Sequence, residues 1–330
     1  MKILVIEYVT GGGLYRQPLP DSLVVEGEGM LQTLLADLAA DPSNQLFTTR
    51  DRRMPELQCN VMVWPVSADQ DPWALWQAKL AEVDAVWPIA PESGAALASL
   101  TRLIERSGIC LLGSSSAAVV LTGSKRATSE RLLACGIQAV QTCLPSEFES
   151  LAGPWVVKPD DGAGCEDTRC FDDAEALADW LAQEGRALTH VVQPFLAGTA
   201  MSLSMLCHEG EAWLLSINRQ RVRLNDGVFS YHGSEVNVPL PDTARWTALA
   251  QAIARAVPGL AGYVGVDLMA AEDGSLTVLE INPRLTTSYV GLHRAIGLNP
   301  ALCVVDLLYN QSSLDSFALA HNMVNVTLHG

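Results

Sequence analysis

Two acidic residues and an amide are placed where they could share a divalent cation. Asp267 and Glu280 flank Asp273-Gly274, a dipeptide typical of a two-residue hairpin turn. If those two residues form the turn, counting outward pairs Asp267 with Glu280, with β-carbons about 5 Å apart. Asn282 is two residues further on and shares their face. Carboxylates and an amide carbonyl are the hard oxygen ligands that magnesium prefers, so the sequence predicts a metal site here.

The alternative for this hairpin is a solvated face that carries acids by chance. Opposed carboxylates repel each other, which disfavours that alternative unless a cation lies between them. The flanking residues Leu268, Leu279 and Ile281 are apolar, and the alternation predicts that they point into the core.

A second candidate site begins where the apolar segment Trp155–Lys158 meets a loop of small residues. Glycines let backbone N–H groups approach phosphate oxygens closely, and Lys158 supplies a positive charge. The loop lacks the Gly-Lys-Ser/Thr of a Walker A motif, and an ordinary turn at a strand end is the alternative. The expected phosphate loop consists of Asp161, Gly162, Ala163, Gly164 and Cys165.

Single cations and one glycine run give weaker signals. Lys125 opens an expected helix, where phosphate binds readily, although a solvated first turn explains it equally. Arg219 ends an expected strand, and its guanidinium suits a carboxylate or acyl phosphate; the alternative is a surface arginine. Gly11–Gly13 lacks the dinucleotide spacing, so a flexible substrate loop is as good an interpretation as NAD binding. The six histidines have no metal-ligand spacing, and a nucleophile elbow is missing.

Residues 1–113 alternate between strand and helix patterns, which predicts a doubly wound parallel sheet. Expected strands are Lys2–Glu7, Cys59–Pro65, Ala85–Ile89 and Ile109–Leu112, and expected helices are Gly29–Leu38, Trp73–Val83 and Ser93–Arg106. Substrate contacts are expected at the strand ends, at Glu7–Gly13 and Ala90–Glu92.

The rest of the chain is expected to form two further units, residues 114–195 and 196–330. The second unit should contain helices at Ser124–Cys135 and Ala174–Gln183 and strands at Pro154–Lys158 and His190–Leu196. The third is richer in strands, with expected elements Ser202–Cys207, Ala212–Arg219, Ala244–Val257 (a helix), Gly262–Ala270 and Leu276–Ile281.

Composition narrows the class of protein. The 330 residues carry 21 Lys plus Arg against 37 Asp plus Glu, a net charge of −16, which disfavours a nucleic-acid partner. No apolar stretch is long enough to span a bilayer, and Glu7 interrupts the N-terminal apolar run, so we expect a strand rather than a signal peptide. Eight cysteines without a C-x-x-C pair indicate reduced thiols and a cytoplasmic protein.

These residues, in this order and spacing, resemble the ATP-grasp superfamily over roughly residues 114–310. The resemblance rests on Lys125, Lys158 with its loop, Asp267, and the segment 280–284, Glu-Ile-Asn-Pro-Arg. It implies ATP with Mg²⁺ or Mn²⁺ as cofactors: both lysines on the phosphates, the 161–165 loop closing over them, and Asp267, Glu280 and Asn282 holding the metal. It also implies a hinge whose backbone contacts adenine, formed by Gln193, Pro194, Phe195 and Leu196.

A narrower resemblance extends across nearly the whole chain, to ligases that join glutamate to tyramine in the biosynthesis of the coenzyme methanofuran. It is carried by Ile6–Tyr8, Glu26-Gly27, Ile89–Glu92, Leu112–Ser116, Leu215–Gln220, Gly233–Asn237 and Glu280–Thr287. The resemblance implies an ADP-forming ligase with small-molecule carboxylate and amine substrates, in which Arg219 and Arg284 stabilise the transferring group.

Three other interpretations stay open at this point: a ligase for another amino acid or peptide, a regulator that only binds ATP, and a dinucleotide-dependent dehydrogenase. The missing fingerprint argues against the dehydrogenase, and cations beyond the phosphate residues argue against a regulator. The oligomeric state, including a homo-oligomer, is not fixed by the sequence.

Overall fold

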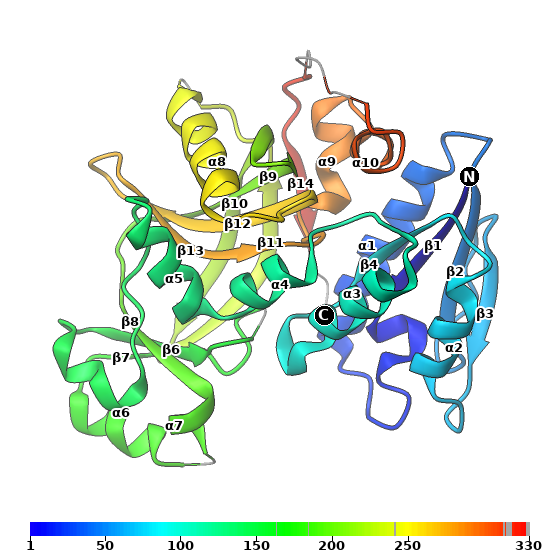
Figure 1. Ribbon diagram of the computed structural model, residues 1–330. Coiled ribbons are helices and arrows are strands. Elements are labelled where there is room, and N and C mark those ends of the chain that lie inside the picture. The colour runs from blue at the N-terminus through cyan, green and yellow to red at the C-terminus, as the bar shows by residue number, and fades with distance from the viewer. Residues whose placement is uncertain (163, 184, 241, 313, 315–318, 328–330) are drawn as a thin grey trace.

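The computed structural model describes residues 1–162, 164–183, 185–240, 242–312, 314 and 319–327, and it places two sheets side by side (Figure 1). The N-terminal sheet is parallel, with strand order β3-β2-β1-β4-β5. Its strands are β1 (Lys2–Glu7), β2 (Gln45–Asp51), β3 (Met62–Val66), β4 (Ala85–Ile89) and β5 (Cys110–Leu111). The expected doubly wound parallel sheet is confirmed.

Helices cover both faces of this sheet, because alternate residues of β1 are buried on opposite sides. Ile3 and Val5 pack toward α1 (Asp21–Leu38), and Leu4 and Ile6 pack toward α2 (Pro72–Leu80) and α3 (Ala96–Ser107). A short 3-10 turn, η2 (Ser93–Ala95), precedes α3.

Strand β2 was not predicted from the sequence. Its second half is polar, yet Thr48, Thr49, Arg50 and Asp51 are all buried. Arg50 is accommodated there because it forms a bidentate ion pair with Glu28 of α1. The alternation of apolar and polar residues cannot indicate a strand whose buried side chains are themselves polar and form hydrogen bonds or ion pairs.

The glycine run after β1 forms a single π-helical turn, η1 (Val9–Gly13), and all five residues are buried. A β-carbon at Gly12 would lie 2.6 Å from Val66 Cγ1, and one at Gly13 would lie 2.5 Å from the Tyr8 ring. The expectation of an open, flexible substrate loop is therefore wrong, because the glycines allow close packing here.

The second sheet is mostly antiparallel and follows the order β13-β12-β9-β10-β11-β7-β6-β8, with β14 paired to β11. Its strands are β6 (Trp155–Pro159), β7 (Arg169–Phe171), β8 (His190–Pro194), β9 (Thr199–His208), β10 (Glu211–Asn225), β11 (Val228–Val236), β12 (Gly262–Ala270), β13 (Leu276–Asn282) and β14 (Val324–Thr327). The helical elements around it are α4 (Ser116–Gly123), α5 (Lys125–Ala134), η3 (Pro145–Ser150), α6 (Ala174–Leu181), α7 (Arg186–Thr189) and α8 (Ala244–Ala256).

The β12–β13 hairpin differs from its prediction at the tip but agrees at the functional pair. The tip is longer than two residues, with Ala270 opposite Leu276 and Gly274 at φ +87°. A register shift between Asp267 and Leu268 then compensates, so that Asp267 lies opposite Glu280 as predicted. The shift leaves Leu279 unpaired, as in a β-bulge, and turns it to line the cavity described below instead of the core.

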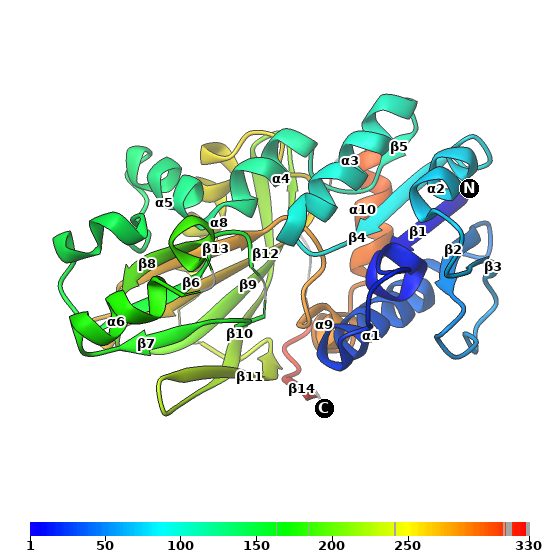
Figure 2. The same cartoon turned by 90° about the horizontal axis from the view of Figure 1, so that it is seen from below.

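Two helices from the end of the chain, α9 (Tyr289–Ile296) and α10 (Pro300–Leu308), lie between the two sheets (Figure 2). Their apolar side chains share one core with β1, α1 and β4. Buried Asp37 of α1 fixes the contact, since it accepts hydrogen bonds from Tyr289 (2.8 Å) and His293 (2.7 Å). The N-terminal sheet is therefore completed by residues that are distant in the sequence.

None of the described helices combines the length and apolar character needed to cross a membrane. All eight cysteines are free, and three of them, Cys143, Cys207 and Cys303, are buried.

Candidate functional site

A cavity of about 420 Å³ opens on the inner face of the second sheet and collects most of the predicted site residues. One end is largely apolar and is formed by the expected hinge and by side chains of β6, β12 and β13. Gln193 is buried at this end and donates a hydrogen bond to Thr142 (2.9 Å). The side chains at this end are Val156, Gln193, Pro194, Phe195, Leu196, Met269 and Leu279. Such a slot suits a flat, apolar ring system.

Two lysines reach the cavity from different elements. Lys158 comes from β6, and Lys125 is the first residue of α5, which Ser124 caps by accepting from the N–H of Ala127. The Lys125 ammonium donates to the carbonyl of Gly162 (2.5 Å) and lies 3.6 Å from the Glu280 carboxylate. Burial lowers the pKa of Lys158, an effect that Glu280 opposes. An incoming anion would relieve this cost, so both lysines are suited to phosphate.

The loop after β6 lies along the cavity, but not all of its residues face it. Gly162, Gly164 and Cys165 line the cavity, and burial raises the pKa of the Cys165 thiol to about 11. Asp161 is exposed, and its carboxylate accepts from the N–H of Gly94 (3.0 Å), so it contacts the N-terminal unit instead. The expectation that Asp161 belongs to the phosphate-binding surface is corrected accordingly; Ala163 lies outside the described residues.

The predicted metal face is present in the geometry of β12 and β13. Asp267 and Glu280 are opposed across the strands, and the Asn282 side-chain amide donates to Asp267 (3.4 Å). Gln220 of β10 donates to the other Asp267 oxygen (2.8 Å). All four residues line the cavity.

The two carboxylates titrate in opposite directions. Burial raises the pKa of Asp267 well above its usual range, and the neighbouring Glu280 raises it further. Burial also acts to raise the pKa of Glu280, but Lys125 and Lys158 outweigh it and hold the pKa at about 2. The pair therefore carries one firmly ionised carboxylate and one whose charge is costly without a cation.

This donor set fits a divalent cation brought in with phosphate. Among the described residues, no three His, Cys, Asp or Glu side chains cluster into a complete metal cage. Two carboxylates and one amide oxygen leave ligand positions for phosphate oxygens and water, which is how magnesium usually binds with nucleotides. The raised pKa of Asp267 is the signature of a carboxylate that lacks its countercharge.

One of the two predicted arginines reaches the cavity and the other does not. Arg284 is nearly buried and forms a bidentate ion pair with Glu92, which follows β4 of the N-terminal sheet (2.9 and 2.7 Å). Arg219 is half-exposed, pairs with Glu235 (2.9 Å) and does not line the cavity. Its expected place in the site is wrong because strand alternation turns it away and presents its neighbour Gln220.

Sequence reasoning missed several polar residues of the cavity. Glu26 of α1 and Tyr231 of β11 line its inner end, together with Gln220, Thr286, Thr287 and Ser288. Burial raises the pKa of Tyr231. Glu26 and Tyr231 come from elements that are far from the site in sequence, so no local spacing could indicate them.

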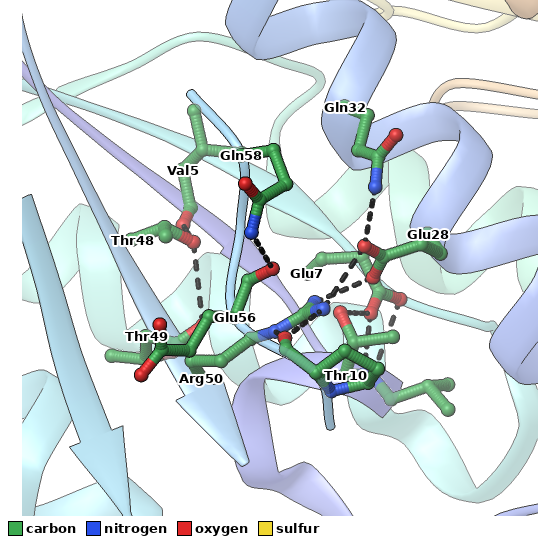
Figure 3. A network of polar contacts seen from close by, with 12 residues as sticks. Val5, Glu7, Thr10, Glu28, Gln32, Thr48, Thr49, Arg50, Glu56 and Gln58 are labelled. Atoms are coloured by element: carbon green, nitrogen blue, oxygen red, sulfur yellow. Dashed lines mark hydrogen bonds and ion pairs between the residues drawn. The ribbon is translucent and has the colours of Figure 1, made fainter. Parts of the chain in front are cut away.

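Figure 3 shows a network of polar contacts at the ends of β1 and β2, which includes Glu28, two residues after Glu26 in α1. Glu7 accepts hydrogen bonds from the backbone (2.5 Å) and hydroxyl (2.6 Å) of Thr10, and Arg50 holds Glu28. Glu7 therefore accepts hydrogen bonds within the turn that follows it and does not line the cavity, contrary to the expected substrate contact. Glu92, by contrast, is connected to the cavity through its ion pair with Arg284.

Two protein-family models match this chain. An ATP-grasp domain model matches residues 122–288, and a pre ATP-grasp 3 domain model matches residues 44–119. The first covers the cavity-lining strands from β6 to β13 together with Lys125.

Among curated proteins, two tyramine–L-glutamate ligases are similar. That of Methanocaldococcus fervens is 30% identical over 213 residues, which is 64% of this chain and 62% of the relative. That of Methanocaldococcus jannaschii is 29% identical over 224 residues, 68% of this chain and again 62% of the relative. The match thus spans less than two thirds of the relatives' own length.

Solved structures share the fold over nearly the whole chain. A putative ATP-grasp superfamily protein from Archaeoglobus fulgidus is 25% identical, with a TM-score of 0.72 covering 98% of this chain and 99% of that one. D-alanine–D-alanine ligase from Bacillus anthracis, complexed with ATP, has a TM-score of 0.64 at 18% identity and covers 94% and 98%.

Proposed function

Because this chain belongs to the ATP-grasp family, we propose that it is a carboxylate–amine ligase that converts ATP to ADP and phosphate. The observation that supports this most is the convergence in one cavity of two lysines, an opposed acid pair and an arginine, beside an apolar slot. A site that only sensed ATP would need the residues that bind the phosphates but no further arginine. Arg284 is such a further arginine, and it is held in place by an ion pair with Glu92, which follows β4 of the parallel sheet.

In the proposed reaction, the chain's own groups act by positioning and electrostatics. Lys125 and Lys158 bind the phosphates, and the hinge at Gln193–Leu196 binds adenine. A magnesium or manganese ion held by Asp267, Glu280 and Asn282 would supply charge neutralisation on the transferring phosphoryl group.

Arg284 is suited to the acyl phosphate. Its Nε and one terminal nitrogen hold Glu92, and the other terminal nitrogen donates to the carbonyl of Leu285 (3.1 Å). Within the described part of the chain, the remaining N–H groups of the two terminal nitrogens have no partner. They form a planar fork that matches a carboxylate or phosphate edge.

For the substrates, we propose glutamate as the carboxylate and tyramine or a related amine as the nucleophile, as in a methanofuran-type pathway. The support is the similarity to two tyramine–L-glutamate ligases. We further propose that residues 1–113 form a substrate unit, 114–195 the small ATP-binding unit with the phosphate loop, and 196–330 the unit with the metal face.

The test is to incubate the protein with ATP, magnesium, L-glutamate and a panel of primary amines, and to identify the products by mass spectrometry. We expect an amide of glutamate, with ADP and phosphate by phosphorus NMR. Pyrophosphate as the main product would refute the acyl phosphate route, and ATP binding without any amide would favour a regulator.

A further inference from the structure

Glu26 is an acid in the cavity that neither the metal face nor the phosphate groups require. It projects from α1 and lines the cavity with Arg284, Tyr231 and Thr287. The Thr287 hydroxyl donates to Glu26 Oε2 at 3.5 Å, the limit of a hydrogen bond. Gly164 and Cys165 of the phosphate loop line the same cavity as Glu26.

In the described part of the chain Glu26 forms no ion pair, and Asp267, the other cavity acid without one, already belongs to the metal face. Glu280 pairs with Lys125, Glu92 pairs with Arg284, and Glu28 pairs with Arg50. Burial raises the pKa of Glu26, and Arg284 and Thr287 offset this effect only in part, so the charged form of Glu26 is incompletely compensated.

The helix residues that follow Glu26 are held by close contacts. Its neighbour Gly27 packs so closely on Glu7 that a β-carbon there would lie 2.6 Å from Glu7 Oε1. Glu28, one residue further on, is held by Arg50 through two hydrogen bonds (2.5 and 2.9 Å). The Glu26 carboxylate is thus presented from a helix that packs tightly at this point, and a helix positions a binding group more precisely than a loop does.

We propose that Glu26 is the specificity residue that binds a primary ammonium group of the substrates, next to the position of the acyl phosphate. This inference rests on the proposed ligase function. The two lysines are assigned to phosphate, the acid pair to the metal, and Glu92 to Arg284, which acts on Glu26 only at a distance. Glu26 is therefore the acid in this cavity that is still open to an ammonium group. The ammonium belongs either to the amine substrate or to the α-position of the amino acid that is activated.

Equilibrium binding to the full-length protein with magnesium and ADP tests the proposal without turnover. Tyramine is compared with 4-hydroxyphenethyl alcohol, and L-glutamate with glutarate, so that each pair differs by one ammonium group. Glu26→Gln should weaken binding of one ammonium compound by roughly tenfold to a hundredfold and leave its neutral counterpart unchanged. The control is Asp21→Asn, an exposed acid at the start of the same helix, which should change neither.

The pair that responds identifies which substrate Glu26 binds. Equal binding of both ammonium compounds by Glu26→Gln and the wild type would overturn the proposal, and so would a wild type that binds neither. If the ammonium compound depends on Glu26 but the wild type forms no amide in the product assay, the ligase function fails while the Glu26 site stands.

Discussion

At the scale of single residues, the acid pair shows how one site can hold two carboxylates of opposite character. Glu280 is kept ionised mainly by two lysines, whereas the charge of Asp267 is opposed by burial and by Glu280 more strongly than Lys158 and Arg284 favour it. Without a cation, the ionised form of Asp267 is therefore the costly member of the pair. Substitutions at the two positions should separate stability from catalysis.

We expect Asp267→Asn to raise the melting temperature of the metal-free protein and Glu280→Gln to lower it or leave it unchanged. Asparagine removes a charge that lacks compensation, while glutamine removes one that two lysines stabilise. Both should lower turnover by roughly a hundredfold or more, about 3 kcal/mol, because each misplaces the cation. Calorimetry without metal and steady-state ADP release measure the two effects; near-normal turnover in either variant would show that the hairpin is only structural.

The stability difference between wild type and Asp267→Asn should also depend on pH. The pKa of Asp267 is raised in the folded state, so its contribution to stability is full below its unfolded value and is lost as pH rises through the folded value. The advantage of the variant should therefore be largest near neutral pH and shrink on acidification. Denaturant unfolding at several pH values without metal measures it, and a constant difference would contradict the raised pKa.

The sequence predicted the site residues whose positions are fixed by residues nearby in the chain, and it did not predict those that are placed by tertiary contacts. Asp267, Glu280, Asn282, Lys125 and Lys158 lie in the cavity as expected, because a hairpin register or a strand end fixes each one nearby in sequence. Arg219 was wrongly predicted to lie in the site, because the sequence near it does not indicate which face of the strand is turned toward the cavity. Glu26 comes from α1 and could not be found without the tertiary contact.

At the scale of elements, the β12–β13 hairpin reaches the predicted pairing by a route that the sequence did not reveal. The Asp-Gly pair indicates a tight turn, but a longer tip forms, and Asp273 accepts from the N–H of Ser275 (2.8 Å). The bulge beside Leu279 then returns the strands to register. β11 was not predicted because Ser230, His232 and Ser234 interrupt its apolar pattern; the side chains of this strand that line the cavity are Phe229 and Tyr231.

Gly274→Ala tests whether the tip influences the site. Gly274 has φ +87°, so alanine should cost about 1 kcal/mol of folding stability, with turnover unchanged. Gly210→Ala, at φ +82° in the β9–β10 turn, is the control for the backbone cost alone, because it has open space around it whereas a β-carbon at Gly274 would lie 2.8 Å from the flexible Arg245 side chain. Chemical denaturation and ADP release are the measurements, and a large fall in turnover for Gly274→Ala alone would show that tip and metal face are coupled.

At the scale of the whole molecule, the cavity depends on both sheets. Glu92 leaves the parallel sheet to hold Arg284, and Asp161 of the phosphate loop contacts Gly94 beside it. Glu26 enters the same cavity from α1. The N-terminal unit therefore contributes groups to the site as well as a scaffold.

Glu92→Gln should lower both stability and the efficiency with which the carboxylate substrate is used. Removing one partner of a buried ion pair is costly, and glutamine restores only part of the hydrogen bonding, so we expect a loss of about 2 kcal/mol. Arg284 would be free to turn toward Glu26, and kcat/KM for the carboxylate should fall at least tenfold while the Kd for Mg-ATP changes little. Asp84→Asn, at an exposed contact in the same sheet, is a control that should leave kcat/KM unaltered.

The position of α9 and α10 also has a consequence for how the chain is made. The face of β1 and β4 that packs on α1 is only completed by residues 289–308, near the far end of the chain. During synthesis, which proceeds from the N-terminus, the parallel sheet must wait with part of its apolar face uncovered until those helices emerge from the ribosome. A domain that usually folds first is here among the last to be finished, and a chaperone that shields this face would act on the nascent chain throughout that interval.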